Sequence, residues 1–234
     1  EPNVIRISGV HAPYSKTSYG KMSHNDWINT FLKYNDDFVA DHFSNTGGIT
    51  EHGRDFQEHV TQHPKDFYPL IQRIITDSRI SNDYRVFGIN GLIKANFSVD
   101  LVSELIEELI EKPLERHNTL FIIWNIDYLI KHKKVKDKIF NFLCHEAINN
   151  PDPEKDDVND PRQRSINTVR GAALDRLMRM GNKDFQTKLF ITLDKAIKQE
   201  KLLAVKFSLI HNSAFLINID QLKAFTIFCR LIKS

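Results

Sequence analysis

The feature that most constrains this chain is the recurrence of apolar residues at the period of an α-helix. Val102, Leu105, Ile106, Leu109 and Ile110 are spaced three, one, three and one residues apart, which places them on one face of a helix. Comparable stripes recur between about residues 23 and 232, whereas the alternation typical of a strand is convincing only near residues 4–7. The spacing therefore predicts an all-α protein.

The helical segments also predict how they are arranged. About eleven helices joined by short connections favour antiparallel neighbours, and a pair spacing of roughly 35 to 40 residues is typical of HEAT-type repeats. We therefore expect antiparallel helix pairs stacked as a HEAT/TPR-like α-solenoid. A compact helical bundle is the alternative arrangement for such a chain.

Two segments depart from the helical pattern. Residues 1–22 contain Gly, Pro, Ser and Tyr without periodicity, which predicts an extended N-terminal arm or linker with a short strand over residues 4–7. The helical repeat domain is expected over residues 23–234, because Ser23 and Asp26 have the spacing of a capping box. Residues 149–164 are rich in Pro and Asp and predict an acidic loop. The abrupt start at Glu1 suggests a piece of a longer polypeptide.

Composition favours a folded core and argues against a dedicated nucleic-acid binder. The 234 residues are 41% apolar and include sixteen Phe, which is typical of a packed interior. The net charge is +2, from 32 basic and 30 acidic residues, whereas nucleic-acid binders usually show a larger basic excess. The lysine-rich segment 131–138 predicts a solvated turn between two helices. A helical-repeat nucleic-acid-binding module that uses this segment is the alternative function.

Catalytic signatures are absent from the sequence. It contains no GxxxxGK[ST], GxGxxG, HExxH or GxSxG motif. His59 and His63 can share a helix face, but Pro64 ends that helix, so we expect surface histidines and no metal site. We expect no enzyme activity, no catalytic residues and no cofactor in this chain; a helical hydrolase with a histidine-metal site is a further alternative. Two cysteines among apolar residues, and no apolar run of about 18 residues, predict a cytoplasmic protein without a membrane partner.

The most unusual segment follows the acidic loop. Asn167, Arg170 and Leu174 are predicted to share one face of a single helix, where a buried Asn and Arg need polar partners. Gly171 in mid-helix predicts a close approach by a neighbouring helix. The favoured interpretation is that these side chains bind a neighbouring helix terminus or the acidic loop, at Asp156, Asp157 and Asp160. A ligand or phosphate contact is the other interpretation.

Four segments resemble a known family. Ser165–Ala173 (SINTVRGAA) is similar to the segment "SINTVRG.A" in the helical C-terminal regions of large bacterial STAND-type NTPases, which include antiviral ATPases of the AVAST class. Met22–Tyr34, Phe56–Phe67 and Tyr84–Leu92 are similar to three further family segments in the same order. The resemblance extends over about residues 20–232, and His63 departs from it because the family has Asp before the proline.

The resemblance implies a function that the residues alone do not. It implies a helical-repeat sensor region that follows a nucleotide-binding switch domain and an N-terminal effector. Such regions recognise a phage protein, commonly the large terminase or the portal, and the full-length protein then oligomerises. The matching residues look like structural positions. They include Trp27, Tyr34, Asn167, Arg170 and Gly171.

We therefore expect a protein-binding module, the target-recognition region of a bacterial STAND NTPase in antiphage defence. A protein partner is expected, nucleic acid is not, and any ATP-binding site belongs to the full-length protein. The candidate partner contacts are the acidic loop and an aromatic residue, namely Asp152, Asp156, Asp157, Asp160 and Trp124. The alternative interpretation of these residues is a solvated loop and a helical core position.

Overall fold

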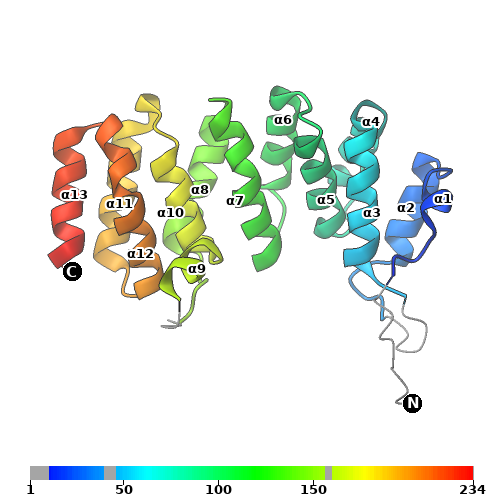
Figure 1. The fold of residues 1–234 in the computed structure, drawn as a ribbon, viewed down its shortest axis with the longest axis horizontal. Helices are drawn as coiled ribbons and strands as arrows, with labels where there is room; N and C mark the ends of the chain where they lie inside the picture. The colour runs from blue at the N-terminus through cyan, green and yellow to red at the C-terminus, as the bar shows by residue number, and fades with distance from the viewer. Residues whose placement is uncertain (1–10, 40–45, 156–159, 234) are drawn as a thin grey trace, which may run out of the picture. The chain divides into compact units, whose positions relative to one another are not determined.

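A computed structural model describes residues 11–39, 46–155 and 160–233. The chain divides into two units, Glu1–Leu109 and Ile110–Ser234. Within the described residues the regular structure is helical, apart from one isolated bridge between His11 and Thr46 (Figure 1). The predicted all-α class is confirmed.

The N-terminal unit is organised around α5. Its helices are α1 (Lys16–Tyr19), α2 (His24–Lys33), α3 (Ile49–Gln62), α4 (Pro64–Thr76), α5 (Asn82–Lys94) and α6 (Val99–Leu109). Helix α5 packs against α3, α4 and α6, and α2 packs against α4. These helices bury their apolar stripes against one another, including all of the predicted stripe on α6 up to Leu109.

Local sequence signals set several of these helix ends. The hydroxyl of Ser23 accepts a hydrogen bond from the Asp26 amide, and the Asp26 carboxylate accepts one from the Ser23 amide at 2.8 Å. This capping box satisfies amides that have no partner within the helix. Pro64 occupies the first turn of α4, where its missing N–H costs no hydrogen bond. Ser81 caps α5 by accepting from the Asp83 amide.

Glycines allow α3 and α5 to approach closely. A Cβ atom at Gly91 would lie 2.7 Å from the Cβ of Val60 and 2.9 Å from the carbonyl oxygen of Gln57. A Cβ atom at Gly53 would lie 2.2 Å from the ring of Phe87. Because real Cβ atoms do not come this close to other atoms, the two helices need glycine at these positions.

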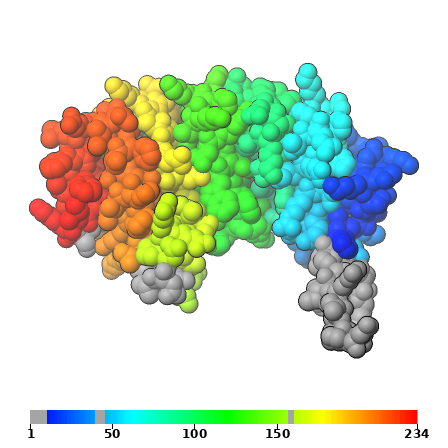
Figure 2. Space-filling model, in the orientation of Figure 1, coloured from blue at the N-terminus to red at the C-terminus, as the bar shows by residue number. Residues whose placement is uncertain are grey.

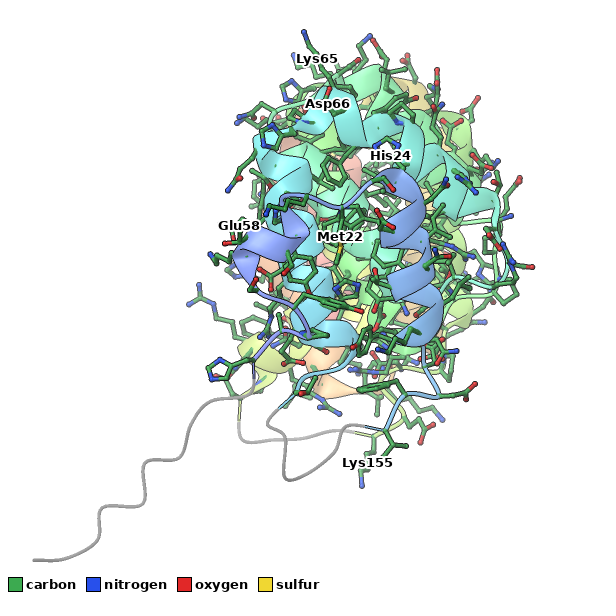
Figure 3. The ribbon with its side chains drawn as sticks, turned by 90° about the vertical axis from the view of Figure 1, so that its right-hand side faces the viewer. Met22, His24, Glu58, Lys65, Asp66 and Lys155 are labelled. Atoms are coloured by element: carbon green, nitrogen blue, oxygen red, sulfur yellow. The ribbon has the colours of Figure 1, made fainter. Side chains whose placement is uncertain are left out.

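The prediction of an extended N-terminal arm over residues 1–22 is partly wrong. The expected strand at residues 4–7 lies outside the described residues, but α1 forms within the arm and the ring of Tyr19 is buried against Trp27. Figure 3 looks at this unit from the side of α1 and α2, with Met22 between them and Glu58 on α3. A short helix therefore replaces an extended linker, because an apolar aromatic side chain gains by covering the core.

The C-terminal unit is organised around α10. Its elements are α7 (Arg116–Lys131), α8 (Asp137–Asn149), α9 (Pro161–Ile166), α10 (Val169–Arg179), η1 (Lys183–Phe185), α11 (Gln186–Gln199), α12 (Leu203–Asn212), η2 (Ser213–Asn218) and α13 (Gln221–Lys233). Helix α10 packs against α7, α8, α9, α11, α12 and η2, and nearly all of its residues are buried. A helix with neighbours on every side is buried on every side.

The segment that was predicted to form a single helix after the acidic loop forms two helices, α9 and α10. The chain breaks between α9 and α10, and Asn167 is the C-cap of α9, so it does not share a helix face with Arg170 as expected. Gly171 explains the break, because a Cβ atom there would lie 2.0 Å from the carbonyl oxygen of Ser165 in α9. The prediction of a close helix approach at Gly171 is confirmed, and the approaching segment is the end of the preceding helix, α9.

Two further observations concern the cysteines and the apolar character of the helices. Both cysteines are free thiols, with Cys144 buried and Cys229 half-buried. In the part of the chain that is described, no helix has the length and apolar character needed to cross a membrane.

Candidate functional site

Large apolar side chains are unevenly distributed on the surface. Among the described residues, twelve are exposed, and nine of these lie between Ile191 and Ile232. They are Ile191, Leu203, Ile210, Phe215, Ile217, Leu222, Phe225, Phe228 and Ile232. Scattered single apolar residues need no explanation, but a concentration on neighbouring elements marks an interaction surface.

Helix α13 carries two apolar stripes. Ala224, Ile227 and Leu231 are buried against the rest of the unit. Leu222 and Phe225 occupy the opposite side and are 77% and 66% exposed. In the space-filling view α13, red at the C-terminal end of the chain, lies at the surface of its unit (Figure 2). A helix that is apolar on both sides but packed on one leaves a stripe available to a partner.

An apolar recess lies between η2 and α13. It has a volume of about 380 Å³ and is lined by Ser213, Ala214, Ile217, Gln221, Ala224, Phe225 and Phe228. The two alanines have no side-chain atoms beyond Cβ, whereas the larger side chains extend further from the backbone. The Ser213 hydroxyl already donates its hydrogen bond to the Ile210 carbonyl at 2.8 Å, so this donor is not free to bind a partner. We name the recess, together with Leu222 and Ile232, the η2–α13 surface.

The helices that carry this surface are basic. From Gln186 to the end of the sequence there are eight basic and three acidic residues, a net charge of +5 in a chain of net +2. Two of the acidic residues pair with basic residues of this segment, and the third, Glu200, pairs with Arg170 of α10. Asp220 lies 3.5 Å from Lys223, and Asp194 binds Lys198 at 2.6 Å and also Arg230. The hydrogen bonds from Lys198 and Arg230 lower the pKa of Asp194, so this carboxylate stays ionised.

The predicted site residue Arg170 is a structural tie. Its guanidinium donates to the Glu200 carboxylate at 2.9 Å. It also donates to the carbonyls of Asn150, Pro151 and Pro153 at 2.8, 3.1 and 3.0 Å. The predicted tie to the loop is therefore present, but it uses backbone carbonyls and Glu200. Asp156 and Asp157 lie outside the described residues.

The other loop residues also stabilise helix ends. The Asp152 carboxylate accepts from the Val169 amide at 2.7 Å at the start of α10 and pairs with Arg116 at 2.9 Å. A carboxylate there also complements the positive end of the helix dipole. Asp160 caps α9 by accepting from the Gln163 amide at 2.9 Å. Asp152 and Asp160 are thus engaged within the chain, which makes them weak partner contacts.

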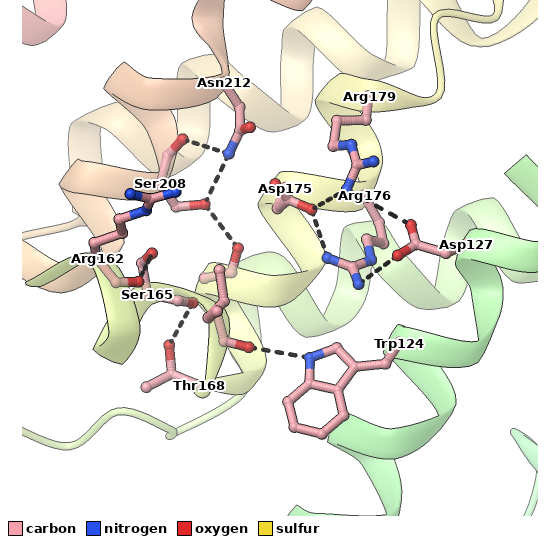
Figure 4. Close-up of polar contacts among 12 residues, drawn as sticks. Trp124, Asp127, Arg162, Ser165, Thr168, Asp175, Arg176, Arg179, Ser208 and Asn212 are labelled. Atoms are coloured by element: carbon pink, nitrogen blue, oxygen red, sulfur yellow. Dashed lines mark hydrogen bonds and ion pairs between the residues drawn. The ribbon is translucent and has the colours of Figure 1, made fainter. Parts of the chain in front are cut away.

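Trp124 holds α7 to the end of α9. It is half-buried, and its indole N–H donates to the carbonyl of Ile166 at 3.0 Å (Figure 4). Its ring also meets that of Phe121 edge-on. Of the motif residues in the N-terminal unit, Trp27 and Tyr34 are both buried. None of these three aromatic residues lines the η2–α13 surface.

A buried ionic cluster lies beside Trp124 on α7 and α10. The Arg176 guanidinium donates to Asp175 at 2.5 Å and to Asp127 at 2.7 Å, and Arg179 lies 3.4 Å from Asp175 (Figure 4). Burial raises the pKa of Asp127, although Arg176 and Arg179 act in the opposite direction. These groups pair with one another across two helices and hold α10 in place; Arg176 and Asp175 are buried, whereas Asp127 and Arg179 are partly exposed.

The histidines that the structure describes do not assemble a metal site. Among the described residues, no three His, Cys, Asp or Glu side chains come together in a way that suits a metal ion. His52 is fully buried. Its Nδ1 accepts from the Tyr19 hydroxyl at 2.7 Å, and its Nε2 donates to Thr30 Oγ1 at 2.9 Å, because that hydroxyl donates its proton to the Trp27 carbonyl. Burial lowers the pKa of His52 to about 4, so the ring is neutral.

A second, larger recess is polar and internally paired. It has a volume of about 440 Å³ next to α8. Lys138 pairs with Glu111 at 2.6 Å there, and the Glu146 carboxylate is bound by His145 and Asn150. Lys138 belongs to the lysine-rich segment that predicted a solvated turn, and this segment spans the end of α7 and the start of α8. Because its charged groups are already paired within the chain, this recess is a weaker candidate for a binding site than the η2–α13 surface.

Comparison with known proteins adds no relative: neither a family model, nor a curated protein, nor a solved structure matches this chain. The described residues define an all-α protein with an apolar surface on its C-terminal helices. Sequence reasoning missed this surface, although the signal was present. Leu222, Phe225 and Ile232 form a second stripe on a helix whose first stripe already accounts for its packing.

Proposed function

We propose that this chain is a protein-binding helical module that acts as the target-recognition region of a larger bacterial STAND NTPase in antiphage defence. The observation that carries the binding role is the η2–α13 surface, where Leu222 and Phe225 are 77% and 66% exposed beside an apolar recess. Covering a side chain such as Phe or Leu contributes about 1.5 to 3 kcal/mol, so a partner that covers several of them gains substantially.

The helix contacts support a repeat architecture for this module. In the N-terminal unit α3 packs against α5, and in the C-terminal unit α8 packs against α10, α10 against α12 and α11 against α13. Packing between every second helix is what stacked antiparallel pairs require. A HEAT/TPR-like solenoid is therefore our proposal for the arrangement, and such arrays commonly bind proteins on an extended face.

The proposed module acts by binding and has no chemistry of its own. The buried ionic groups on α7 and α10 pair with one another, and His52 is enclosed by aromatic rings. In the proposal, nucleotide chemistry belongs to another part of the full-length protein. The resemblance of Ser165–Ala173 and three other segments to STAND-type NTPases supports this placement, and also supports a phage protein as the target.

The experiment is a binding assay with purified phage large terminase and portal proteins. Surface plasmon resonance on the immobilised chain is expected to detect one of the two classes, and Phe225→Glu is expected to weaken it at least tenfold, which corresponds to about 1.4 kcal/mol. Phe121→Glu is the matched control, because Phe121 is an exposed aromatic residue of the same unit outside the surface. Binding of neither class contradicts the proposed target.

The nucleic-acid alternative has its own outcome in this assay. The segment from Gln186 onward is basic, so retention on DNA or RNA at low salt needs to be measured alongside protein binding. Retention that falls steeply with salt and exceeds binding to both phage proteins would favour the nucleic-acid-binding module. Retention of neither nucleic acid at low salt eliminates it.

A further inference from the structure

We infer that the η2–α13 surface binds an amphipathic helix whose apolar stripe is flanked by acidic residues. The inference rests on the proposed function and specifies the partner's chemistry. Three observations carry it: the recess is apolar, it lies alongside a helix, and the C-terminal segment from Gln186 onward, which contains it, is basic.

The geometry favours a helix as the occupant. Leu222, Phe225 and Ile232 span eleven residues of α13, and the ten steps from Leu222 to Ile232 correspond to about 15 Å at 1.5 Å per residue. Large side chains of one helix fit the groove between two neighbouring helical elements, and helix-in-groove recognition uses anchors spaced by three, four and seven residues. The lining combines the small Ala214 and Ala224 with the larger Ile217, Phe225 and Phe228, which together can contact a bulky apolar anchor.

The charge favours acidic flanks on that helix. Lys223, Arg230 and Lys233 are the charged residues of α13 itself, which has no acidic residue, and Lys233 lies next to the exposed Ile232. Asp220 and Asp194 offset Lys223 and Arg230 only in part, because the region from Gln186 onward keeps a net charge of +5. Complementary charge raises the rate of encounter and selects against basic partners.

The same charge disfavours a second copy of the chain. A symmetric dimer would place the two η2–α13 surfaces against each other and bring their basic residues together, which costs energy. A lipid surface is the other source of acidic groups, but it is flat, whereas this surface is a recess between helical elements. Both occupants are outcomes of the experiment below.

The experiment uses two designed 18-residue peptides with the same leucine stripe. One has glutamates on both flanks and the other has lysines. Fluorescence anisotropy on the whole chain is expected to show at least tenfold tighter binding of the glutamate peptide, with an advantage that shrinks as salt is added. Lys233→Glu is expected to reduce that advantage at least threefold, whereas Lys65→Glu, on the exposed first turn of α4, leaves it unchanged.

Several results would overturn the inference. Equal affinity for the two peptides would contradict the proposal that the partner is acidic. Binding of neither peptide would contradict the proposal that the partner is a helix. Sedimentation with phosphatidylserine vesicles in place of peptide binding identifies a lipid surface, and a concentration-dependent mass in sedimentation equilibrium that Phe225→Glu abolishes identifies a second copy. If the glutamate peptide binds but no terminase or portal protein does, the proposed target fails and this inference stands. If a terminase or portal protein binds but the glutamate peptide does not, this inference fails and the proposed target stands.

Discussion

The two units of this protein treat their apolar residues differently. Among the described residues, the N-terminal unit exposes one large apolar side chain, Val39, whereas the C-terminal unit exposes eleven. The N-terminal unit buries a continuous aromatic cluster around His52, which includes Tyr19, Trp27 and Phe31. The apolar side chains of this unit are therefore covered by other side chains of the same unit. The C-terminal unit leaves part of its apolar surface to be covered by something else.

The interiors differ as well. Around α10 the C-terminal unit buries charges, with Arg170 bound to Glu200 and Arg176 bound to Asp175 and Asp127. Such networks position helices precisely but contribute less stability than apolar packing of the same volume. One unit therefore encloses its apolar side chains in its own core, whereas the other holds α12, η2 and α13 in place with apolar side chains exposed, which is the feature on which the proposed binding role rests.

The largest expected effect comes from the aromatic cluster. Trp27→Ala removes a fully buried ring and is expected to lower the free energy of unfolding by about 3 to 5 kcal/mol. Urea unfolding followed by circular dichroism measures it. Trp124→Ala is the matched control, because this half-buried ring is expected to cost less. Equal losses for the two variants would show that the N-terminal unit does not depend on its aromatic core.

The buried ion pair gives the next effect. Arg170→Met leaves the Glu200 carboxylate, whose side chain is 8% exposed, without its guanidinium partner. We expect a loss of about 3 kcal/mol, because a buried charge without its partner is costly. Trp124 fluorescence reports on this unit in a Trp27→Phe background, since the chain has two tryptophans.

A double variant tests the cause. Arg170→Met with Glu200→Met removes both charges, and part of the lost stability is expected to return. A double variant no more stable than Arg170→Met alone would show that the loss comes from the carbonyls of Asn150, Pro151 and Pro153, which lose their donor.

Acid is expected to destabilise the N-terminal unit through His52. Burial lowers the pKa of His52 from 6.5 to about 4, so the unfolded chain binds the proton more tightly than the folded one. The stability from the neutral ring is complete above pH 6.5 and is lost as the pH falls toward 4. Between pH 7 and 4.5 this amounts to about 2 to 3 kcal/mol, from 1.36 kcal/mol per pKa unit.

The measurement compares urea unfolding of the wild type and His52→Gln at the two pH values. Carboxylates contribute equally to both proteins, so the difference in pH dependence belongs to His52. The variant is less stable at pH 7, because glutamine does not reproduce the ring stacking with Trp27, but it is expected to lose less stability on acidification. An identical loss in both proteins would mean that His52 titrates normally in the folded state.

Much of the fold could be predicted from the sequence. Apolar spacing predicts α6 and α13, and capping residues predict the starts of α2 and α5, because these signals are local. The break at Asn167 was missed, since it depends on the carbonyl of Ser165 approaching Gly171 in space. The short helix α1 was missed because its formation depends on tertiary contacts of Tyr19 with Trp27 and His52.

The candidate site was harder to predict for the same reason. Asp152 and Asp160 look available in the sequence, but each accepts a hydrogen bond from a backbone amide at the start of a helix. Leu222 and Phe225 look like core residues, because apolar periodicity does not show which of two stripes will face the protein. The choice is made by the elements that pack against α13, here η2, α12 and α11, and Ala224, Ile227 and Leu231 are the residues of α13 that become buried.

The smallest effect on stability should come from substitutions on the η2–α13 surface. This prediction tests most directly whether the exposed apolar residues of the C-terminal unit lie outside its core. Phe225→Ser is expected to change the free energy of unfolding by no more than about 0.5 kcal/mol, because its ring is already 66% exposed. Ile227→Ser, two residues along the same helix and 5% exposed, is expected to cost about 2 to 4 kcal/mol. Binding of the dye ANS should fall in Phe225→Ser. If Phe225→Ser instead destabilises the protein as much as Ile227→Ser does, the ring belongs to the core and the surface is no platform for a partner.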